Sequence, residues 1–144
     1  MYNGKINYLI GYYAVDILLD NNIYCVYDGS GHKVNLKYNE ISEKDFNDKQ
    51  RKRYFYLKSK GYKLFRIINE NNRDKLPSDD ILLHMKEIAF LYLQREDCNF
   101  INFNIDNGFI QTKHFTFHFD FYNDSIEKLK DCLLEITQIG KTPI

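Results

Sequence analysis

The stretch that decides the fold class runs from residue 12 to residue 67 and reads YYAVDILL at 12–19, YDGSGH at 27–32, DKQR at 48–51 and GYKLFRI at 61–67. The first segment is typical of a strand that carries one acid, Asp16. The second leaves a strand through two glycines, which permit a tight path and let a ligand approach the backbone. The third is basic and has a helical pattern, and the fourth returns as a strand. This order predicts a mixed α/β core built around a chemical site.

Neighbouring residues complete a ββαβ unit. Residues 8–19, interrupted at Gly11, and residues 23–27 alternate as strands do and predict a hairpin. Ser42 is a suitable N-cap for a helix that begins near residue 43. Gly61 fits the position just after the end of that helix, where a left-handed backbone is common. A third strand is expected over residues 62–68.

The remaining residues predict an α-β-hairpin-α extension. A helix follows Ser78, with an apolar stripe at helical spacing. Residues 99–106 and 109–122 alternate as strands, and Asn107-Gly108 between them is a strong hairpin signal. Four phenylalanines, at 115, 117, 119 and 121, share one face of the second strand. A final helix is expected to end near Gln138. We expect one domain over 1–144, with the ββαβ core at 1–68 and the extension at 69–144.

The net charge is zero, yet the charges are unevenly placed. Residues 44–66 hold nine basic and two acidic residues, whereas 67–144 hold eight basic and thirteen acidic ones. A compact basic segment can bind a phosphate backbone locally. The predicted nucleic-acid contacts are Lys49, Arg51, Lys52, Arg53 and Lys58. The alternative is a solvated helix face without a ligand.

The cysteines and the hydropathy pattern bound the location of the protein. Cys25, Cys98 and Cys132 are far apart and odd in number, which fits neither a disulfide framework nor a zinc site. No segment has the pattern of a signal peptide, and no apolar run is long enough to cross a membrane. We therefore expect a cytoplasmic protein with reduced thiols and no membrane partner.

Four residues predict metal-dependent chemistry. Asp16 and Asp28, on adjacent predicted strands, are candidate ligands for Mg²⁺, which prefers oxygen donors. His32 is a candidate general acid or base near neutral pH. Asp48 is a further candidate in an active enzyme, and Arg51 can neutralise charge on a phosphate. The alternatives are that Asp16 caps a backbone group or pairs with a lysine, that Asp28-Gly29 is only a turn, and that His32 is a surface histidine.

A weaker pattern lies in the late strand, where His114, His118 and Asp120 fall on its polar side. His118 and Asp120 are close enough in sequence to share a metal, whereas His114 is about 13 Å from His118 along a strand. A polar strand face without a metal is the simpler interpretation.

The stretch from Val15 to Ile67 resembles the very-short-patch-repair type of PD-(D/E)XK nuclease domain, a group that includes the EDxHD homing endonucleases. The resemblance rests on four segments: VDI at 15–17, VYDGSGH at 26–32, DKQR at 48–51 and GYKLFRI at 61–67. Residues 76–79 and 101–107 are also similar to downstream parts of phage members. The resemblance implies a metal-dependent DNA endonuclease with Asp16, Asp28, His32 and Asp48 in the active site.

Two departures from the family pattern favour binding over catalysis. Val26 stands where most relatives carry a glutamate, and a valine cannot bind a cation. Relatives also have a helix before the first strand, often with a further acid, and residues 1–5 are not expected to form it. Loss of groups that act as a unit normally abolishes catalysis.

Three functions therefore stay open. The first is a degenerate nuclease-fold protein that binds nucleic acid or a nucleic-acid-handling host protein. A short chain with the Asn-, Lys-, Ile- and Tyr-rich composition of an AT-rich genome suits a phage or mobile element, where an anti-defence inhibitor such as an anti-CRISPR is plausible. The second is an active Mg²⁺-dependent DNA endonuclease. The third is a structural protein that dimerises through its aromatic late strands.

Overall fold

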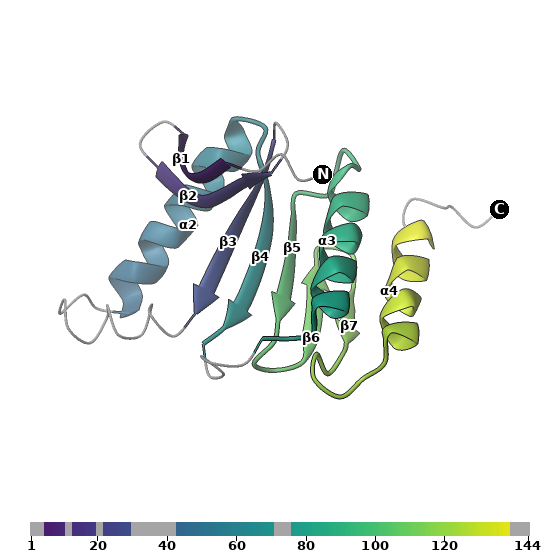
Figure 1. Ribbon diagram of the computed structural model, residues 1–144. Coiled ribbons are helices and arrows are strands. Elements are labelled where there is room, and N and C mark those ends of the chain that lie inside the picture. Colours follow the sequence, from purple (N-terminus) through teal and green to yellow (C-terminus); the bar gives the residue numbers. More distant parts are fainter. Residues whose placement is uncertain (1–4, 11–12, 20–21, 30–42, 71–75, 139–144) are drawn as a thin grey trace.

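The structure is a computed structural model that describes residues 5–10, 13–19, 22–29, 43–70 and 76–138; within these ranges the side chains of 5–10, 13–19, 28, 29, 43–47 and 50 lie outside the description. A seven-stranded mixed sheet forms its centre, with the strands in sequence order (Figure 1). The strands are β1 (Lys5–Ile10), β2 (Tyr13–Leu19), β3 (Ile23–Gly29), β4 (Lys63–Asn69), β5 (Phe100–Asn104), β6 (Phe109–Thr112) and β7 (Thr116–His118). The central strands β3, β4 and β5 are parallel, and the outer strands pair antiparallel. The predicted mixed α/β class is confirmed.

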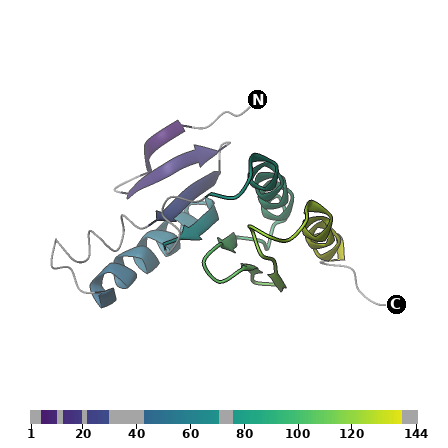
Figure 2. The same ribbon diagram turned by 60° about the horizontal axis from the view of Figure 1, so that its bottom comes forward.

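Helices cover both faces of the sheet. The described helices are α2 (Glu43–Ser59), α3 (Asp79–Leu93) and α4 (Ile126–Gln138). Figure 2 shows α2 on one side of the sheet and α3 with α4 on the other. The connection from β3 to β4 contains α2, and the connection from β4 to β5 contains α3. Both connections move across the sheet in the same direction, yet the two helices lie on opposite faces. The two crossovers therefore have opposite hands, although right-handed connections strongly predominate in proteins.

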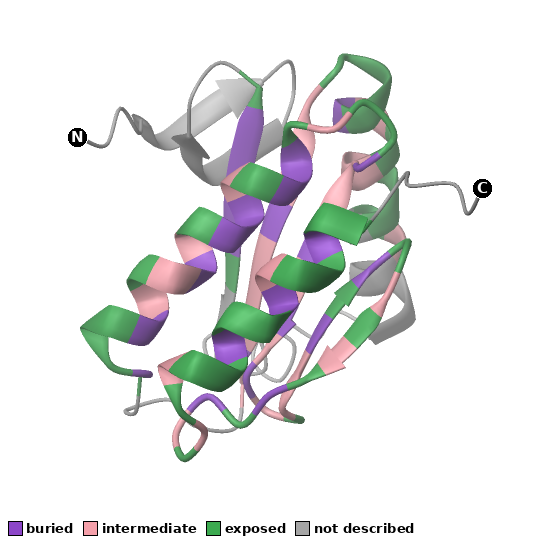
Figure 3. Cartoon of the chain, turned by 90° about the vertical axis from the view of Figure 1, so that its right-hand side faces the viewer, coloured by how far each residue is buried: buried purple, intermediate pink, exposed green. Residues whose placement is uncertain are grey.

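The larger core lies between the sheet and the helices α3 and α4. Its α3 stripe is the predicted one, with Met85, Ala89 and Tyr92 fully buried. In α4, Leu129, Cys132 and Ile136 are buried, and exposed residues alternate with them along both helices (Figure 3). Ser78 caps α3 as predicted, because its side chain accepts a hydrogen bond from the amide of Ile81. None of the described helices has the length and apolar composition needed to span a membrane.

A smaller core fixes α2 on the opposite face. Tyr24 and Val26 of β3 are buried there together with Leu57 of α2. The helix ends as predicted at Gly61, whose φ is +87°. The amide of Tyr62 donates to the carbonyl of Leu57 at 2.9 Å and that of Gly61 to Lys58 at 3.0 Å, which is the Schellman arrangement. This end therefore determines where β4 begins.

Two predicted strands are wrong in extent. The expected strand over 8–19 is two strands, because the chain reverses between Ile10 and Tyr13, which pair across β1 and β2. The core is therefore βββαβ rather than ββαβ. The expected strand over 109–122 is also divided, into β6 and β7. There the hydroxyl of Thr112 accepts from the amides of His114 and Phe115 at 3.0 and 3.1 Å and holds a turn.

Candidate nucleic-acid interface

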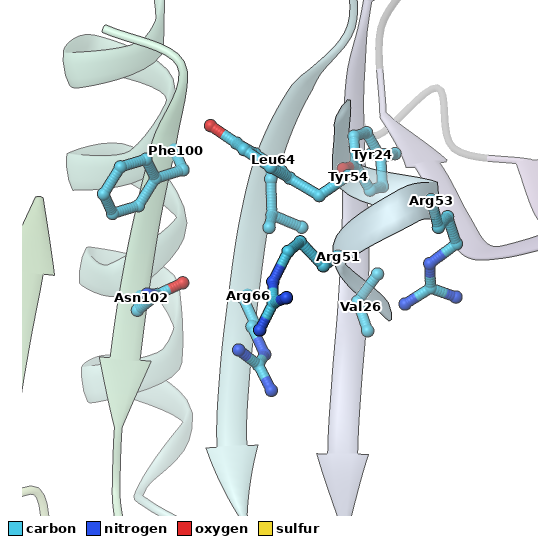
Figure 4. A pocket seen from close by; sticks show the side chains of 9 residues that line it. All are labelled: Tyr24, Val26, Arg51, Arg53, Tyr54, Leu64, Arg66, Phe100 and Asn102. Atoms are coloured by element: carbon cyan, nitrogen blue, oxygen red, sulfur yellow. The ribbon is translucent and has the colours of Figure 1, made fainter. Parts of the chain in front are cut away.

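A pocket of about 330 Å³ lies between α2 and the sheet, and it is lined by Tyr24, Val26, Arg51, Arg53, Tyr54, Leu64, Arg66, Phe100 and Asn102 (Figure 4). Helix α2 supplies three of these side chains, and β3, β4 and β5 supply two each. Such a volume is at the lower end of the range for small-ligand sites. It has room for a single nucleotide-sized group.

Strand register explains why these positions meet. Val26 is opposite Arg66, and Arg66 is opposite Asn102, so the three form one row across β3, β4 and β5. Tyr24, Leu64 and Phe100 form the next row on the same face, because side chains two residues apart in a strand point the same way. Arg66 and Asn102 therefore lie side by side in one row, next to Val26, and the other row is apolar or aromatic.

Three arginines face this pocket from two directions. Arg51 and Arg53 come from α2, and Arg66 comes from β4. In Figure 4 the guanidinium groups of Arg51 and Arg66 lie toward the same end of the pocket, and Arg53 lies on the side of β3. Planar guanidinium groups bind phosphate oxygens with two parallel hydrogen bonds. Anionic ligands are therefore the class that this lining suits.

Two tyrosines and a phenylalanine form the aromatic part of the wall. Burial raises the pKa of Tyr24 and of Tyr54, so both hydroxyls stay protonated at neutral pH and can donate hydrogen bonds. The rings of Tyr54 and Phe100 meet edge to face, with centroids 6.2 Å apart. Aromatic side chains beside arginines are the usual combination in proteins that bind single-stranded nucleic acid.

Asn102 contributes a buried polar group that lacks a hydrogen-bond donor in the described part of the structure. Its Oδ1 atom is buried and has no hydrogen-bond partner among the described residues. A buried polar atom without a partner is rare and costs roughly 1–3 kcal/mol, so it often indicates a missing ligand or water. In Figure 4 this side chain forms the β5 wall of the pocket. A ligand with an N–H or O–H group would satisfy it.

The predicted basic residues divide into two groups. Arg51 and Arg53 line the pocket, whereas Lys49, Lys52 and Lys58 are exposed elsewhere on α2. Asp48, predicted as a catalytic residue, lies on the same helix, and its Oδ1 is 3.4 Å from Nη1 of Arg51. Both side chains of this pair are well exposed, so the ion pair contributes little to stability. Arg51 can release it when a phosphate binds.

The predicted metal ligands are placed only through their backbones. Asp16 lies in β2, and Asp28 lies in β3 opposite Ile68 of β4. Their side chains, and the whole of His32, lie outside the described part of the structure, so the metal site stays a prediction. Val26, which stands where most of the resembled nucleases carry a glutamate, is 5% exposed and lines the pocket beside Arg66. No carboxylate is among the described residues that line the pocket.

Sequence reasoning missed Tyr24, Tyr54, Arg66, Phe100 and Asn102 as site residues. Arg66 lies in the strand sequence KLFRIIN and Asn102 in FINFN. Each strand has other polar residues, so the sequence pattern does not single out these two. The suggested pair His118 and Asp120 is not supported either. Asp120 instead caps a turn, where its Oδ1 accepts from the amides of Tyr122 and Asn123 at 2.9 and 3.1 Å.

No protein-family model matches the chain, no curated protein matches it, and no solved structure matches it. The resemblance to the repair-type nucleases therefore rests on the quoted motifs alone.

Proposed function

We propose that this protein binds nucleic acid through the pocket and the exposed face of α2, and that it does so without cutting it. The observation that carries this proposal is the combination of Arg51, Arg53 and Arg66 around one pocket whose floor is an apolar Val26. Most nucleases of the related type carry a carboxylate where the valine is. Phosphate binding needs only the arginines.

Each part of the pocket has a role in this proposal. The arginines bind phosphate oxygens, and the lysines Lys49, Lys52 and Lys58 extend the basic surface along α2. Phe100 is half-buried and offers an aromatic surface at the pocket wall. Base–aromatic contacts contribute roughly 1–3 kcal/mol per base and tolerate any sequence. Single-stranded nucleic acid, whose bases are free to enter, is therefore the preferred ligand.

An active Mg²⁺-dependent endonuclease is the second candidate. Asp16 and Asp28 belong to neighbouring strands, β2 and β3, which is the placement such a site requires. Two carboxylates can hold one cation, with water filling the other positions. Against this, Asp48 is already engaged in an exposed ion pair with Arg51. We therefore place cleavage behind binding.

Dimerisation through the aromatic late strands has less support. Phe119 and Phe121 are 1% and 2% exposed and belong to the chain's own core. Phe115 and Phe117 pack against the same core.

Within a cell, a binding-only protein of this size would suit the inhibition of a host defence protein that handles nucleic acid. That role rests on the proposed binding.

A binding assay tests the first proposal. Fluorescence anisotropy with a labelled single strand and with the matching duplex should give tighter binding to the single strand. The double variant Arg51→Ala/Lys52→Ala changes two exposed residues of α2 and should weaken binding without unfolding the protein. Lys130→Ala, an exposed substitution on α4, is the matched control. Equal affinities for the three proteins would contradict the proposed interface.

A cleavage assay separates the two candidates. Plasmid and single-stranded DNA are incubated with the protein and either Mg²⁺ or Mn²⁺. We expect no cleavage with either ion. Cleavage that disappears in Asp16→Ala would establish the endonuclease and exclude the binding-only function.

A further inference from the structure

Three potential metal ligands meet at the end of α3, beside the sheet face opposite to α2. Asp97 and Cys98 lie in the connection between α3 and β5, and His114 lies in the turn between β6 and β7. The Sγ atom of Cys98 is 3.6 Å from Oδ1 of Asp97 and 3.9 Å from Nδ1 of His114. One ligand atom from each of the three residues lies within 4.8 Å of the other two.

We propose that Asp97, Cys98 and His114 form a zinc site. Tetrahedral Zn²⁺ with a thiolate at about 2.3 Å and nitrogen or oxygen ligands at about 2.0–2.1 Å requires a separation of about 3.6 Å between the sulfur and each lighter atom. The two separations in this structure differ from that value by a few tenths of an ångström at most. The exposed side chain of Asp97 must also rotate toward Nδ1 of His114 to complete the geometry.

The identity of the donors selects the metal. A thiolate, an imidazole and one carboxylate suit Zn²⁺, whereas Mg²⁺ and Ca²⁺ prefer sets of oxygen ligands. The side chain of Asp97 is 63% exposed and that of His114 is 23% exposed, so an ion can enter from solvent. Three protein ligands leave the fourth position for water.

Contacts around the histidine identify Nδ1 as a nitrogen that faces the sulfur, at 3.9 Å. The other nitrogen, Nε2, is 3.1 Å from Oδ2 of Asp97. The two nitrogens point to opposite sides of the ring, so one carboxylate cannot accept from Nε2 and ligate an ion at Nδ1 at the same time. Asp97 therefore gives up its contact with Nε2 when it ligates the ion, and Nε2 can then donate to water.

Tyr92 is the group that a metal must displace. Its hydroxyl is 2.7 Å from Nδ1 of His114, and the tyrosine is fully buried. The hydroxyl also interacts with the side chain of Thr112, so it keeps a partner when a metal takes the nitrogen. Tyr92→Phe removes the competing donor and should leave zinc binding at least as tight as in the unmodified protein.

Isothermal titration calorimetry of the purified protein with Zn²⁺ tests the site. We expect one ion per chain, and Co²⁺ in its place should give thiolate-to-metal charge-transfer absorption. Cys98→Ala should weaken Zn²⁺ binding by more than about 100-fold. Replacing a residue that only hydrogen-bonds to a metal ligand usually lowers the affinity by up to about 100-fold, and loss of a ligand itself should exceed that. Cys132→Ala removes another fully buried thiol and is the matched control. His114→Ala should weaken Zn²⁺ binding in the same way, and His118→Ala, on the same part of the chain, is its control.

Thermal unfolding monitors the fold of each variant. Zn²⁺ should raise the melting temperature of the unmodified protein and of Cys132→Ala, but not that of Cys98→Ala. If Cys98→Ala fails to fold, Asp97→Asn, an exposed substitution, takes its place and should also lose the effect. Absence of zinc binding by the unmodified protein would overturn the proposal, as would equal binding by Cys98→Ala and Cys132→Ala. In either case the cluster would be a hydrogen-bonded network alone.

Discussion

Val26 and Arg66 are neighbours across β3 and β4, and together they determine which ions suit the pocket. A buried valine provides no ligand for a cation, and a guanidinium group repels one. The sequence marked Val26 as a departure from the resembled pattern and predicted Arg51 and Arg53 as nucleic-acid contacts. It did not identify Arg66 or Asn102, because their alignment depends on the register between strands that are distant in sequence.

Gly108 occupies a position where both the backbone angle and the space around it favour glycine. Its φ is +71°, and an added Cβ would lie 3.3 Å from the carbonyl oxygen of Phe119. Gly61 has a φ of +87° with open space around it. Backbone strain alone should lower the free energy of unfolding of Gly61→Ala by about 1–2 kcal/mol. Gly108→Ala should lose more, measured by urea unfolding, and a smaller loss than in Gly61→Ala would contradict the contact argument.

Asp124 should make stability depend on pH. Its carboxylate accepts from the amide of Asp120 at 2.8 Å and from Nζ of Lys128 at 2.9 Å, and these bonds lower its pKa below 3.8. Because this pKa is lower in the folded protein than in the unfolded chain, the ionised carboxylate stabilises the fold at pH values above the pKa of the unfolded chain. The stabilisation is lost as the pH falls through the pKa of the folded protein. Asp124→Asn should therefore have a lower melting temperature at neutral pH.

The same comparison at acid pH is the check on that prediction. The difference between Asp124→Asn and the unmodified protein should shrink as the pH falls below 3.8. Circular dichroism melts over this range measure it. A difference that is constant with pH would mean that the carboxylate charge contributes nothing.

Among the elements, α2 is the one that brings the sheet and the basic residues together. Its end was predictable, because Gly61 is a residue type that the Schellman arrangement favours. Its attachment depends chiefly on Leu57, which is fully buried against Tyr24 and Val26.

We expect Leu57→Ala to lower the free energy of unfolding by about 2–5 kcal/mol, because it leaves a cavity under α2. The variant should also weaken nucleic-acid binding, since the helix carries Arg51 and Arg53. Phe55→Ala, on the same helix at 56% exposure, should change stability by no more than about 0.5 kcal/mol. Chemical denaturation measures both, and equal losses would show that α2 is held in another way.

Other elements were not predictable from alternation alone. The run from 109 to 122 alternates throughout, yet Thr112 holds a turn that separates β6 from β7. The four phenylalanines still reach one core, because the turn keeps their side toward α3 and α4. Nor could the pattern show that α3 and α2 lie on opposite faces, since both helices follow a strand of the same sheet.

At the scale of the molecule, the two faces of the sheet differ in what packs against them. The α3 and α4 face contains most of the buried apolar side chains, and the proposed zinc site lies at its margin. The α2 face has a smaller core and the arginine-lined pocket. The zero net charge gives no indication of this division, whereas the local excess of basic residues over 44–66 does.

The salt dependence of binding is the most direct test of nucleic-acid recognition at the pocket. Each phosphate contact that is lost should reduce the slope of log Kobs against log salt concentration by about 1. We expect Arg51→Ala to show this reduction toward a labelled single strand, with the slope of Lys130→Ala unchanged from that of the unmodified protein. Identical slopes for all three proteins would contradict binding through α2 and its pocket.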